Sequence, residues 1–267
     1  MSTRPRGPLP GALPMALLGA LLGALLLLAG CTAPDAPPPA DPADPAEAAQ
    51  LADFRRLAYG AARPASSRDH LAKWEQPLRV ALVDVASEGD REAARLHLQD
   101  LAALTGLAVG EAAPQTANLL VFFAADPFEA ARRHRGLYAH RIADARSFDS
   151  QLAGMAPDST CFGFLWGGWP NGRGIDFGIV FLRTDRGERT VKGCLVQQTT
   201  QVLGLMHDLD PEADSIFSDS GRDVDLTEGD RLMVRLLYDA RLKPGMGWAE
   251  TEPLARAALR DLKRGRS

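Results

Sequence analysis

The stretch QQTTQVLGLMHD, residues 197 to 208, decides what kind of fold the chain has. Residues four apart share one face of an α-helix, so Gln197 and Gln201 stand one above the other. The apolar residues around them form the opposite stripe, which we expect to pack on a core while the glutamines face a cleft. Gly204 can adopt a positive φ and end the helix, and the turn after it would bring His207 back toward the glutamine face.

The spacing of this stretch is similar to the long zinc-peptidase pattern H-E-x-x-H-x-x-G-x-x-H, in which three imidazoles bind zinc and a glutamate is the general base. Here the three ligand positions hold Gln197, Gln201 and His207, and the base position holds Gln198. An amide is a weak zinc ligand and cannot accept the proton that a carboxylate takes. We therefore expect no catalytic residue, no bound metal and no other cofactor. On spacing alone, the alternative is an ordinary helix C-cap in which His207 caps exposed carbonyls.

A longer segment carries a resemblance to a known family. Residues 194 to 246, CLVQQTTQVLGLMHDLDPEADSIFSDSGRDVDLTEGDRLMVRLLYDARLKPGM, closely resemble the family called domain of unknown function 2927, which consists of exported proteobacterial proteins. Trp74 before LRVAL, and Cys161 ahead of Cys194, fit the same family, so the resemblance covers most of residues 70 to 246. It implies a single α+β domain of the zincin or metzincin type, with a mixed β-sheet packed on helices and a degenerate active-site helix.

This chain departs from the family in that helix. The family usually has Cys-Ile-x-Glu-Glu-x-x-Gln and then x-Leu-Gly-Leu-x-Asn-Asp, whereas Gln197 and Gln198 replace both acids here. The change removes the residue that a weakly active relative would use as its base. His207 stands where the family has Asn, so its match to the zinc pattern can be accidental.

Residues 1 to 30 have the features of an export signal. Arg4 and Arg6 precede the apolar run MALLGALLGALLLLAG, which stops at Cys31 and is shorter than the roughly 20 residues of a spanning helix. The sequence LAGC at its end resembles a bacterial lipobox, which implies that Cys31 is acylated and anchors the chain to a lipid bilayer. The alternatives are an uncleaved anchor or an ordinary signal peptide. Thr32 in place of Asp implies the outer membrane, facing the periplasm.

The next segment reads as a tether, and residues 51 to 267 as the domain. Residues 32 to 50, TAPDAPPPADPADPAEAAQ, are almost all Ala, Pro and Asp and cannot bury an apolar core. With Cys31, they form the predicted tether of residues 31 to 50. Loss of Arg4 and Arg6 takes the formal charge from -4 to -6, and LKRGRS at the C-terminus is the only basic block. We therefore expect no nucleic-acid partner.

The two remaining cysteines predict a disulfide bond. Cys161 and Cys194 lie in a chain that the leader directs to a compartment where disulfides persist. A bridge between them would lower the conformational entropy of the unfolded chain. In the chain-entropy model this stabilises the folded state by roughly 3 to 4 kcal/mol. The alternative is two buried free thiols.

Hydrophobic periodicity predicts alternating strands and helices along the domain. The expected elements are strands at 78–84 and 117–124, helices at 88–104 and from Asp126 onward, two strands within 160–185 joined by a Gly-rich turn, and helices at 188–203, from Thr227 onward and at 250–264. A strand–helix–strand order favours a right-handed crossover and a parallel pair of strands. Four histidines without ligand spacing are expected at the surface: His70, His97, His134 and His140. Trp166 and Trp169 flank the turn, where they would form a binding rim or fold onto the core.

These features predict a cleft that binds rather than cuts. We expect Gln197, Gln198, Gln201, His207 and Asp208 to line a cleft for a peptide or protein partner of the cell envelope. An edge strand near residues 175 to 182 would pair with the extended chain through backbone hydrogen bonds. Two other functions stay open: a metal-dependent hydrolase that uses His207 and nearby aspartates, and a purely structural envelope protein.

Overall fold

The computed structural model describes residues 44–60, 69–85, 87–142, 144–167, 174–218 and 222–265. The predicted export signal, Cys31 and the tether as far as residue 43 lie outside the described residues, and so does Trp169. Among the described residues, we find no helix with the length and apolar character needed to cross a membrane.

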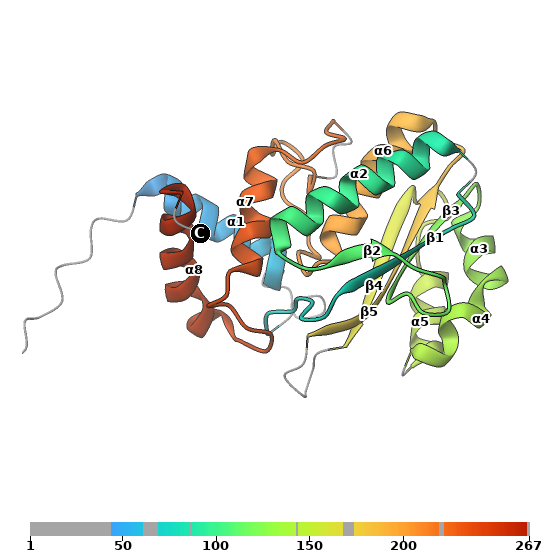
Figure 1. Cartoon of the computed structure of the whole chain (residues 1–267), viewed down its shortest axis with the longest axis horizontal. Helices are drawn as coiled ribbons and strands as arrows, with labels where there is room; N and C mark the ends of the chain where they lie inside the picture. Colours follow the sequence, from blue (N-terminus) through green and yellow to red (C-terminus); the bar gives the residue numbers. More distant parts are fainter. Residues whose placement is uncertain are drawn as a thin grey trace, which may run out of the picture. The chain divides into compact units, whose positions relative to one another are not determined.

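A mixed five-stranded sheet with the order β2-β1-β3-β5-β4 forms the centre of the domain (Figure 1). Its strands are β1 (Leu78–Val83), β2 (Val109–Glu111), β3 (Leu119–Ala124), β4 (Cys161–Gly167) and β5 (Ile175–Arg183). All neighbouring pairs are parallel except β4 and β5, which are antiparallel. The predicted parallel pair (β1 and β3) and the predicted strand pair around the Gly-rich turn (β4 and β5) are both confirmed.

The position of β5 corrects one prediction. Residues 175 to 182 do not form an edge strand, because β5 lies between β3 and β4, and β4 is the edge strand instead. The pairing with β3 runs from Leu119 opposite Gly178 to Ala124 opposite Arg183. An almost uninterrupted run of buried residues in β5 fits a strand covered on both faces.

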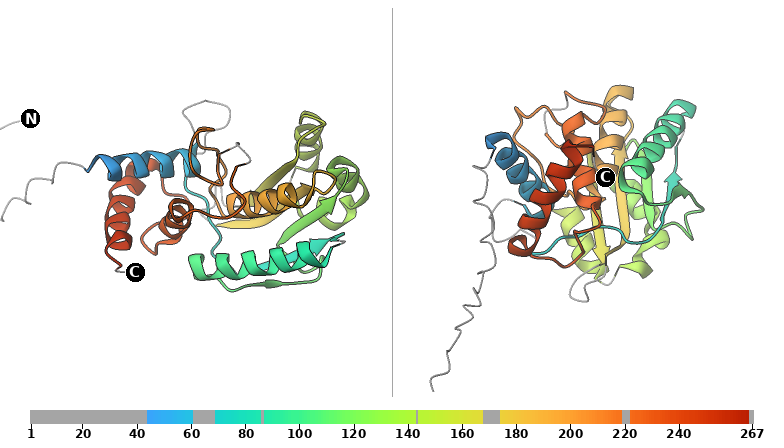
Figure 2. Two further views of the ribbon diagram at one scale, coloured as in Figure 1. Left: turned by 90° about the horizontal axis from the view of Figure 1, so that it is seen from above. Right: turned by 60° about the vertical axis from the view of Figure 1, so that its left-hand side comes forward.

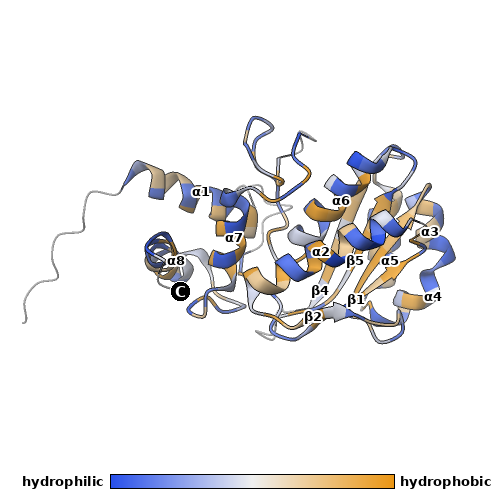
Figure 3. Ribbon diagram, turned by 45° about the horizontal axis from the view of Figure 1, so that its top comes forward, coloured by the Kyte–Doolittle hydropathy of each residue, from blue (hydrophilic) through white to orange (hydrophobic). Residues whose placement is uncertain are grey.

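Helices cover both faces of the sheet, and the fold is α+β, as predicted. One side holds α2 (Glu88–Thr105) and α6 (Glu188–Gln201). α7 (Glu228–Tyr238) packs on α2, α8 (Trp248–Lys263) on α7, and α1 (Pro45–Tyr59) on α8. The other side holds α3 (Pro127–Arg133), α4 (Arg135–Tyr138) and α5 (Ala145–Ala153), next to a 3-10 turn at Ala139–Arg141. Figure 1 shows α2 and α6 on one side of the strands and α3 to α5 on the other. Apolar colour gathers on the strands, and the helices carry hydrophilic colour on their outer faces (Figure 3).

Alternation along β3 divides the buried side chains into two cores, because successive side chains of a strand point to opposite faces. Leu119 and Val121 join the core under α1, α2, α6, α7 and α8, and Phe122 joins the core under α3 to α5. Trp166 belongs to the rim of the second core, where its ring centroid lies 5.7 Å from that of Phe177. For Trp166, the structure therefore favours packing against the core over a free binding rim.

The helix α1 corrects the predicted boundary of the tether. It begins at Pro45, inside residues 31 to 50, and Asp44 caps it by accepting a hydrogen bond from the amide of Ala46 at 3.0 Å. Proline is well tolerated at the first helical position, so a Pro-rich composition did not exclude a helix here. The α1 and α8 helices lie side by side in both views of Figure 2. The folded domain therefore begins by Asp44 rather than after residue 50.

Several helices begin or end at a residue that caps them. Asp126 accepts hydrogen bonds from two amides at the start of α3, and Gly106 ends α2 in the left-handed conformation. Thr227 and Asp230 form the capping box of α7. Each of these caps depends only on residues close to it in the sequence.

His97 is buried, so its predicted place at the surface is wrong. Only 8% of it is exposed, and its Nε2 lies 3.3 Å from the hydroxyl of Thr200 on α6. Burial lowers the pKa of its imidazole to about 4. His97 lies on the inward face of α2 beside Leu98 and Leu101, whereas Leu96 is 53% exposed.

Candidate functional site

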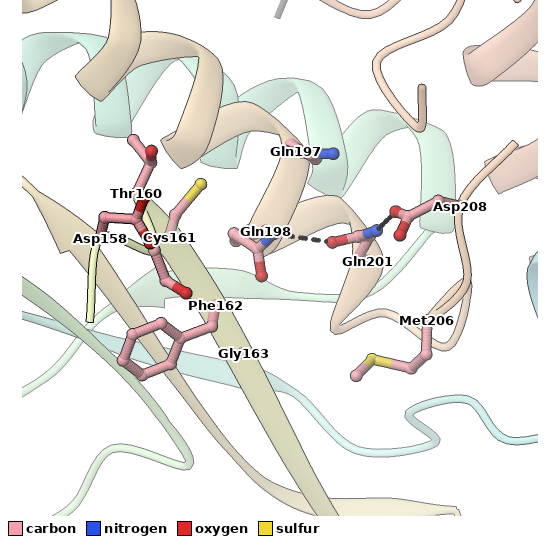
Figure 4. Close-up of a pocket in the computed structure, with 11 residues that line it drawn as sticks. Asp158, Thr160, Cys161, Phe162, Gly163, Gln197, Gln198, Gln201, Met206 and Asp208 are labelled. Atoms are coloured by element: carbon pink, nitrogen blue, oxygen red, sulfur yellow. Dashed lines mark hydrogen bonds between the residues drawn. The ribbon is translucent and has the colours of Figure 1, made fainter. Parts of the chain in front are cut away.

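A cavity of about 430 Å³ lies between the edge strand β4 and the C-terminal half of α6 (Figure 4). It is lined from the β4 side by Asp158, Ser159, Thr160, Cys161, Phe162 and Gly163, from α6 by Gln197, Gln198 and Gln201, and from the following turn by Met206 and Asp208. The structure thus brings together four of the five residues predicted to line a cleft, namely Gln197, Gln198, Gln201 and Asp208.

The fifth predicted residue, His207, lies elsewhere. Its backbone amide donates to the carbonyl of Leu57 at 3.2 Å. A Cβ added to Gly60 would come within 2.8 Å of the imidazole ring, so the ring packs closely against the end of α1. Gly204 does adopt a positive φ of 127°, as predicted, but the turn delivers His207 to α1 and not to the cavity.

Two large side chains hold the end of α6 in place. The indole Nε1 of Trp74 donates to the carbonyl of Val202 at 2.8 Å, and the hydroxyl of Tyr238 donates to the carbonyl of Leu203 at 3.1 Å. These carbonyls lie at the C-cap of α6 and just after it, where the helix has no partner of its own for them. Both donors come from outside α6, which fixes the helix against the core and so fixes its glutamines at the cavity.

The buried glutamines form a hydrogen-bonded chain with Asp208. Gln201 Nε2 donates to Asp208 Oδ1 at 2.7 Å, and Gln198 Nε2 donates to Gln201 Oε1 at 2.9 Å (Figure 4). A carboxylate can only accept, so Gln201 must turn its NH2 group to Asp208 and its oxygen to Gln198. Gln198 must then use its own NH2 group toward Gln201. The chain therefore leaves the amide oxygen of Gln198 facing the cavity.

This donor set does not fit zinc. Gln201 uses both ends of its amide within the chain to Gln198 and Asp208, and His207 lies outside the cavity. Structural and catalytic zinc sites use imidazole, thiolate or carboxylate ligands that converge on one point. In the ranges that the structure describes, no three His, Cys, Asp or Glu side chains are grouped so that they could hold a metal ion.

The other wall of the cavity comes from β4, the edge strand of the described sheet. The carbonyl of Thr160 accepts from the amide of Arg183 at 2.9 Å, which sets the side of β4 that bonds to β5. Backbone groups of a strand alternate between its two edges, so those of Cys161, Gly163 and Leu165 point away from β5. No described strand pairs with β4 on that side. Among the described residues, these amides and carbonyls therefore have no strand partner on their outer side.

The disulfide between Cys161 and Cys194 is confirmed and joins the two walls. It connects β4 to α6 over a sequence separation of 33. Both cysteines also line a second cavity of about 270 Å³, which shares Thr160, Cys161 and Gln197 with the first. The bridge therefore ties β4 to α6 where the two cavities adjoin.

A buried carboxylate supports the segment that follows Asp208. Asp230 is 2% exposed and accepts hydrogen bonds from the hydroxyl of Ser215 at 2.5 Å and the amide of Ile216 at 3.0 Å. Leu209 is bridged to Ser218 in the same segment. Asp230 thus caps α7 and positions the loop beside the groove with one side chain.

Sequence reasoning missed the residues of the β4 wall. Asp158 and Phe162 precede the helix by more than 20 residues, and no motif links them to it. Gly163 did carry a signal, because a glycine inside a strand often marks the close approach of another group. Here a Cβ would lie 3.0 Å from Val202 and 3.2 Å from the Gln198 amide oxygen.

The fold and the groove define a class: an α+β domain whose antiparallel edge strand and neighbouring helix enclose an amide-lined groove. The chain belongs to the family described as "Protein of unknown function (DUF2927)", whose sequence model matches residues 47–257. The family resemblance seen in the sequence is thereby confirmed, and the match covers most of α1 and most of α8. No curated protein matches the chain significantly.

Proposed function

We propose that this protein is a lipid-anchored protein of the bacterial envelope whose metzincin-like domain binds an extended peptide segment of an envelope partner without cutting it. One observation carries the proposal: an open strand edge lies beside a groove in which hydrogen-bonded amides occupy the positions of a metal ligand and a general base. Gln198 and Gln201 are both buried and bonded to each other. An amide at these positions supports binding and offers no base.

Strand addition is the binding mode that this geometry favours. An extended peptide beside β4 would bond to the outward amides and carbonyls of Cys161, Gly163 and Leu165, and backbone bonds of this kind give affinity for many sequences. The cavity beside Gln198 would take an alternate side chain and add specificity. The disulfide of Cys161 keeps β4 at a fixed distance from α6 while the peptide binds.

The binding mode is tested by hydrogen exchange on the mature protein in detergent micelles. An eight-residue peptide is first selected from a random library on the immobilised protein. We expect it to protect the amides of Gly163 and Leu165, while that of Phe164, which already faces β5, changes little. The control is the same peptide with alternate backbone amides methylated, which should not bind. Failure to select any peptide, protection confined to other segments, or chelator-sensitive cleavage of the peptide would overturn the proposal.

Membrane attachment is tested separately through Cys31. Labelled palmitate should be incorporated into the wild-type chain and should be absent from Cys31→Ser, which should also leave the membrane fraction. The signal LAGC supports this expectation because the acylated residue of such a signal is its cysteine. Label retained by Cys31→Ser would contradict it.

A further inference from the structure

Three aromatic side chains form a row along one face of the edge strand β4. Successive side chains of a strand point to opposite faces, so Phe162, Phe164 and Trp166 share one face and Gly163 lies on the other. The ring centroids of Phe162 and Phe164 are 5.9 Å apart, and those of Phe164 and Trp166 are 6.1 Å apart. Figure 4 shows the ring of Phe162 pointing away from Gln198. The row therefore lies on the face of β4 opposite to the glutamines of α6.

Phe164 and Trp166 are covered by the domain on two sides only. On β5, Phe164 is paired with Ile179 and Trp166 with Phe177. From α5, the ring of Phe148 lies 4.9 Å from that of Phe164 and 5.5 Å from that of Trp166. Both rings nevertheless stay only partly buried, and no described strand lies on the outer side of β4. We therefore expect their uncovered surface at the edge that an added strand would occupy.

A segment that pairs with β4 would present its side chains to both faces of this edge. Alternate side chains would lie beside the aromatic row, and those between them would point toward the cavity. Aromatic side chains on one strand favour aromatic or β-branched neighbours on the next. The cavity differs, because seven of its eleven lining residues carry a polar side chain, including Gln197, Gln198 and Gln201. The two faces therefore favour different side chains.

Resting on the proposed function, we propose that the bound segment is an amphipathic β-strand. It places aromatic or β-branched side chains at alternate positions against Phe164 and Trp166, and polar side chains between them in the cavity. A shift of one residue would exchange the two sets, so the same pattern also fixes the register of the segment. Backbone pairing along β4 provides affinity for extended chains in general, and the alternation selects among them.

Peptides of equal composition test the pattern. Two octapeptides hold the same four apolar residues (Tyr and Val) and the same four polar residues (Ser and Gln), alternating in one and arranged in adjacent pairs in the other. Their affinities are measured on the mature protein in uncharged detergent, at concentrations at which both peptides are monomeric. We expect the alternating peptide to bind about tenfold tighter, because several cross-strand pairs add. Equal affinities overturn this inference and leave the proposed function standing, whereas binding by neither peptide overturns both.

Matched variants assign the preference to the aromatic row. Phe164→Ala should lose most of the preference and keep its affinity for the peptide with paired residues. Phe128→Ala is the control, because Phe128 is also partly buried against the same core but lies on α3. A preference that survives in Phe164→Ala, or that is lost equally in Phe128→Ala, contradicts the assignment.

Fluorescence quenching tests the contact without changing the row. In Trp169→Phe with Trp248→Phe, the remaining tryptophans are Trp166 and Trp74, and Trp74 is only 1% exposed. Quenching by acrylamide therefore reports on Trp166. The alternating peptide should shield this ring when it binds. Quenching that does not change on binding would overturn the inference, even if Phe164→Ala fails to fold.

Discussion

Gly204 shows at the scale of one residue how closely the turn after α6 approaches the rest of the domain. Its φ is 127°, and an added Cβ would lie 2.0 Å from the carbonyl oxygen of Ala72. We expect Gly204→Ala to lower the free energy of unfolding by about 3 kcal/mol or more, because backbone strain and overpacking add. Urea unfolding followed by circular dichroism measures the loss.

Gly106 supplies the matched control for this prediction. It also has a positive φ, of 70°, but nothing lies within 4 Å of the Cβ that alanine would add. Gly106→Ala should therefore lower the free energy of unfolding by only about 1 kcal/mol, which is the cost of a positive φ for alanine. Equal losses in the two variants would show that the contact with Ala72 does not constrain the turn.

Single residues also show where sequence reasoning stops. The common face of Gln197 and Gln201, and the positive φ of Gly204, follow from helix geometry and from the properties of glycine, so they were predicted. The place of His207 depends on α1, more than 140 residues earlier in the chain. The hydrogen-bonded chain of Gln198 and Gln201 likewise depends on where the tertiary fold places Asp208. Local patterns contain neither piece of information.

At the scale of elements, Glu47 attaches α1 to α8. It is 4% exposed and accepts from Arg260 Nε at 2.6 Å and from Arg256 Nη1 at 2.9 Å. The bonds from Arg260 are the main cause that lowers the pKa of this carboxyl below 4.5, ahead of those from Arg256. We expect Glu47→Gln to lower the free energy of unfolding at neutral pH by about 1–3 kcal/mol, since the buried side chain loses its charge-assisted bonds to the partly exposed arginines.

The pH dependence identifies the carboxylate as the cause. A lowered folded-state pKa means that the stabilisation is complete above the unfolded value near 4.5 and is lost as the pH falls through the folded value. The difference between wild type and Glu47→Gln should therefore shrink below pH 4.5. Glu92→Gln, in an exposed pair with Arg95, is the control and should change little. A difference that does not vary with pH would contradict this account.

Two elements also mark the limits of sequence prediction. The strands and helices between residues 78 and 263 were largely predicted from periodicity and caps. The helix α1 was missed because Ala, Pro and Asp around Pro45 resemble a linker until α8 is present to pack against it. The order of β4 and β5 was predicted wrongly because hairpin pairing does not reveal which strand then pairs with β3.

At the scale of the whole molecule, the disulfide connects the sheet to the helical layer that carries the glutamines. Cys161 lies on the edge strand and Cys194 on α6, 33 positions apart. Closing a loop of this length lowers the conformational entropy of the unfolded chain, which stabilises the folded state by about 3–4 kcal/mol in the entropy model. We expect Cys161→Ala with Cys194→Ala to lose about that much stability in urea unfolding. The amides of β4 should also exchange faster, because the edge strand is then held only by β5 and by side-chain packing.

Reduction provides the internal control for this prediction. Dithiothreitol should bring the wild-type midpoint close to that of the double variant and should leave the double variant unchanged, because no bridge remains to be broken. Peptide affinity should fall in parallel if the bridge sets the width of the groove between β4 and α6. Thiol labelling shows whether the reductant has opened the bridge. If it has and the wild-type midpoint does not change, packing alone stabilises the two layers.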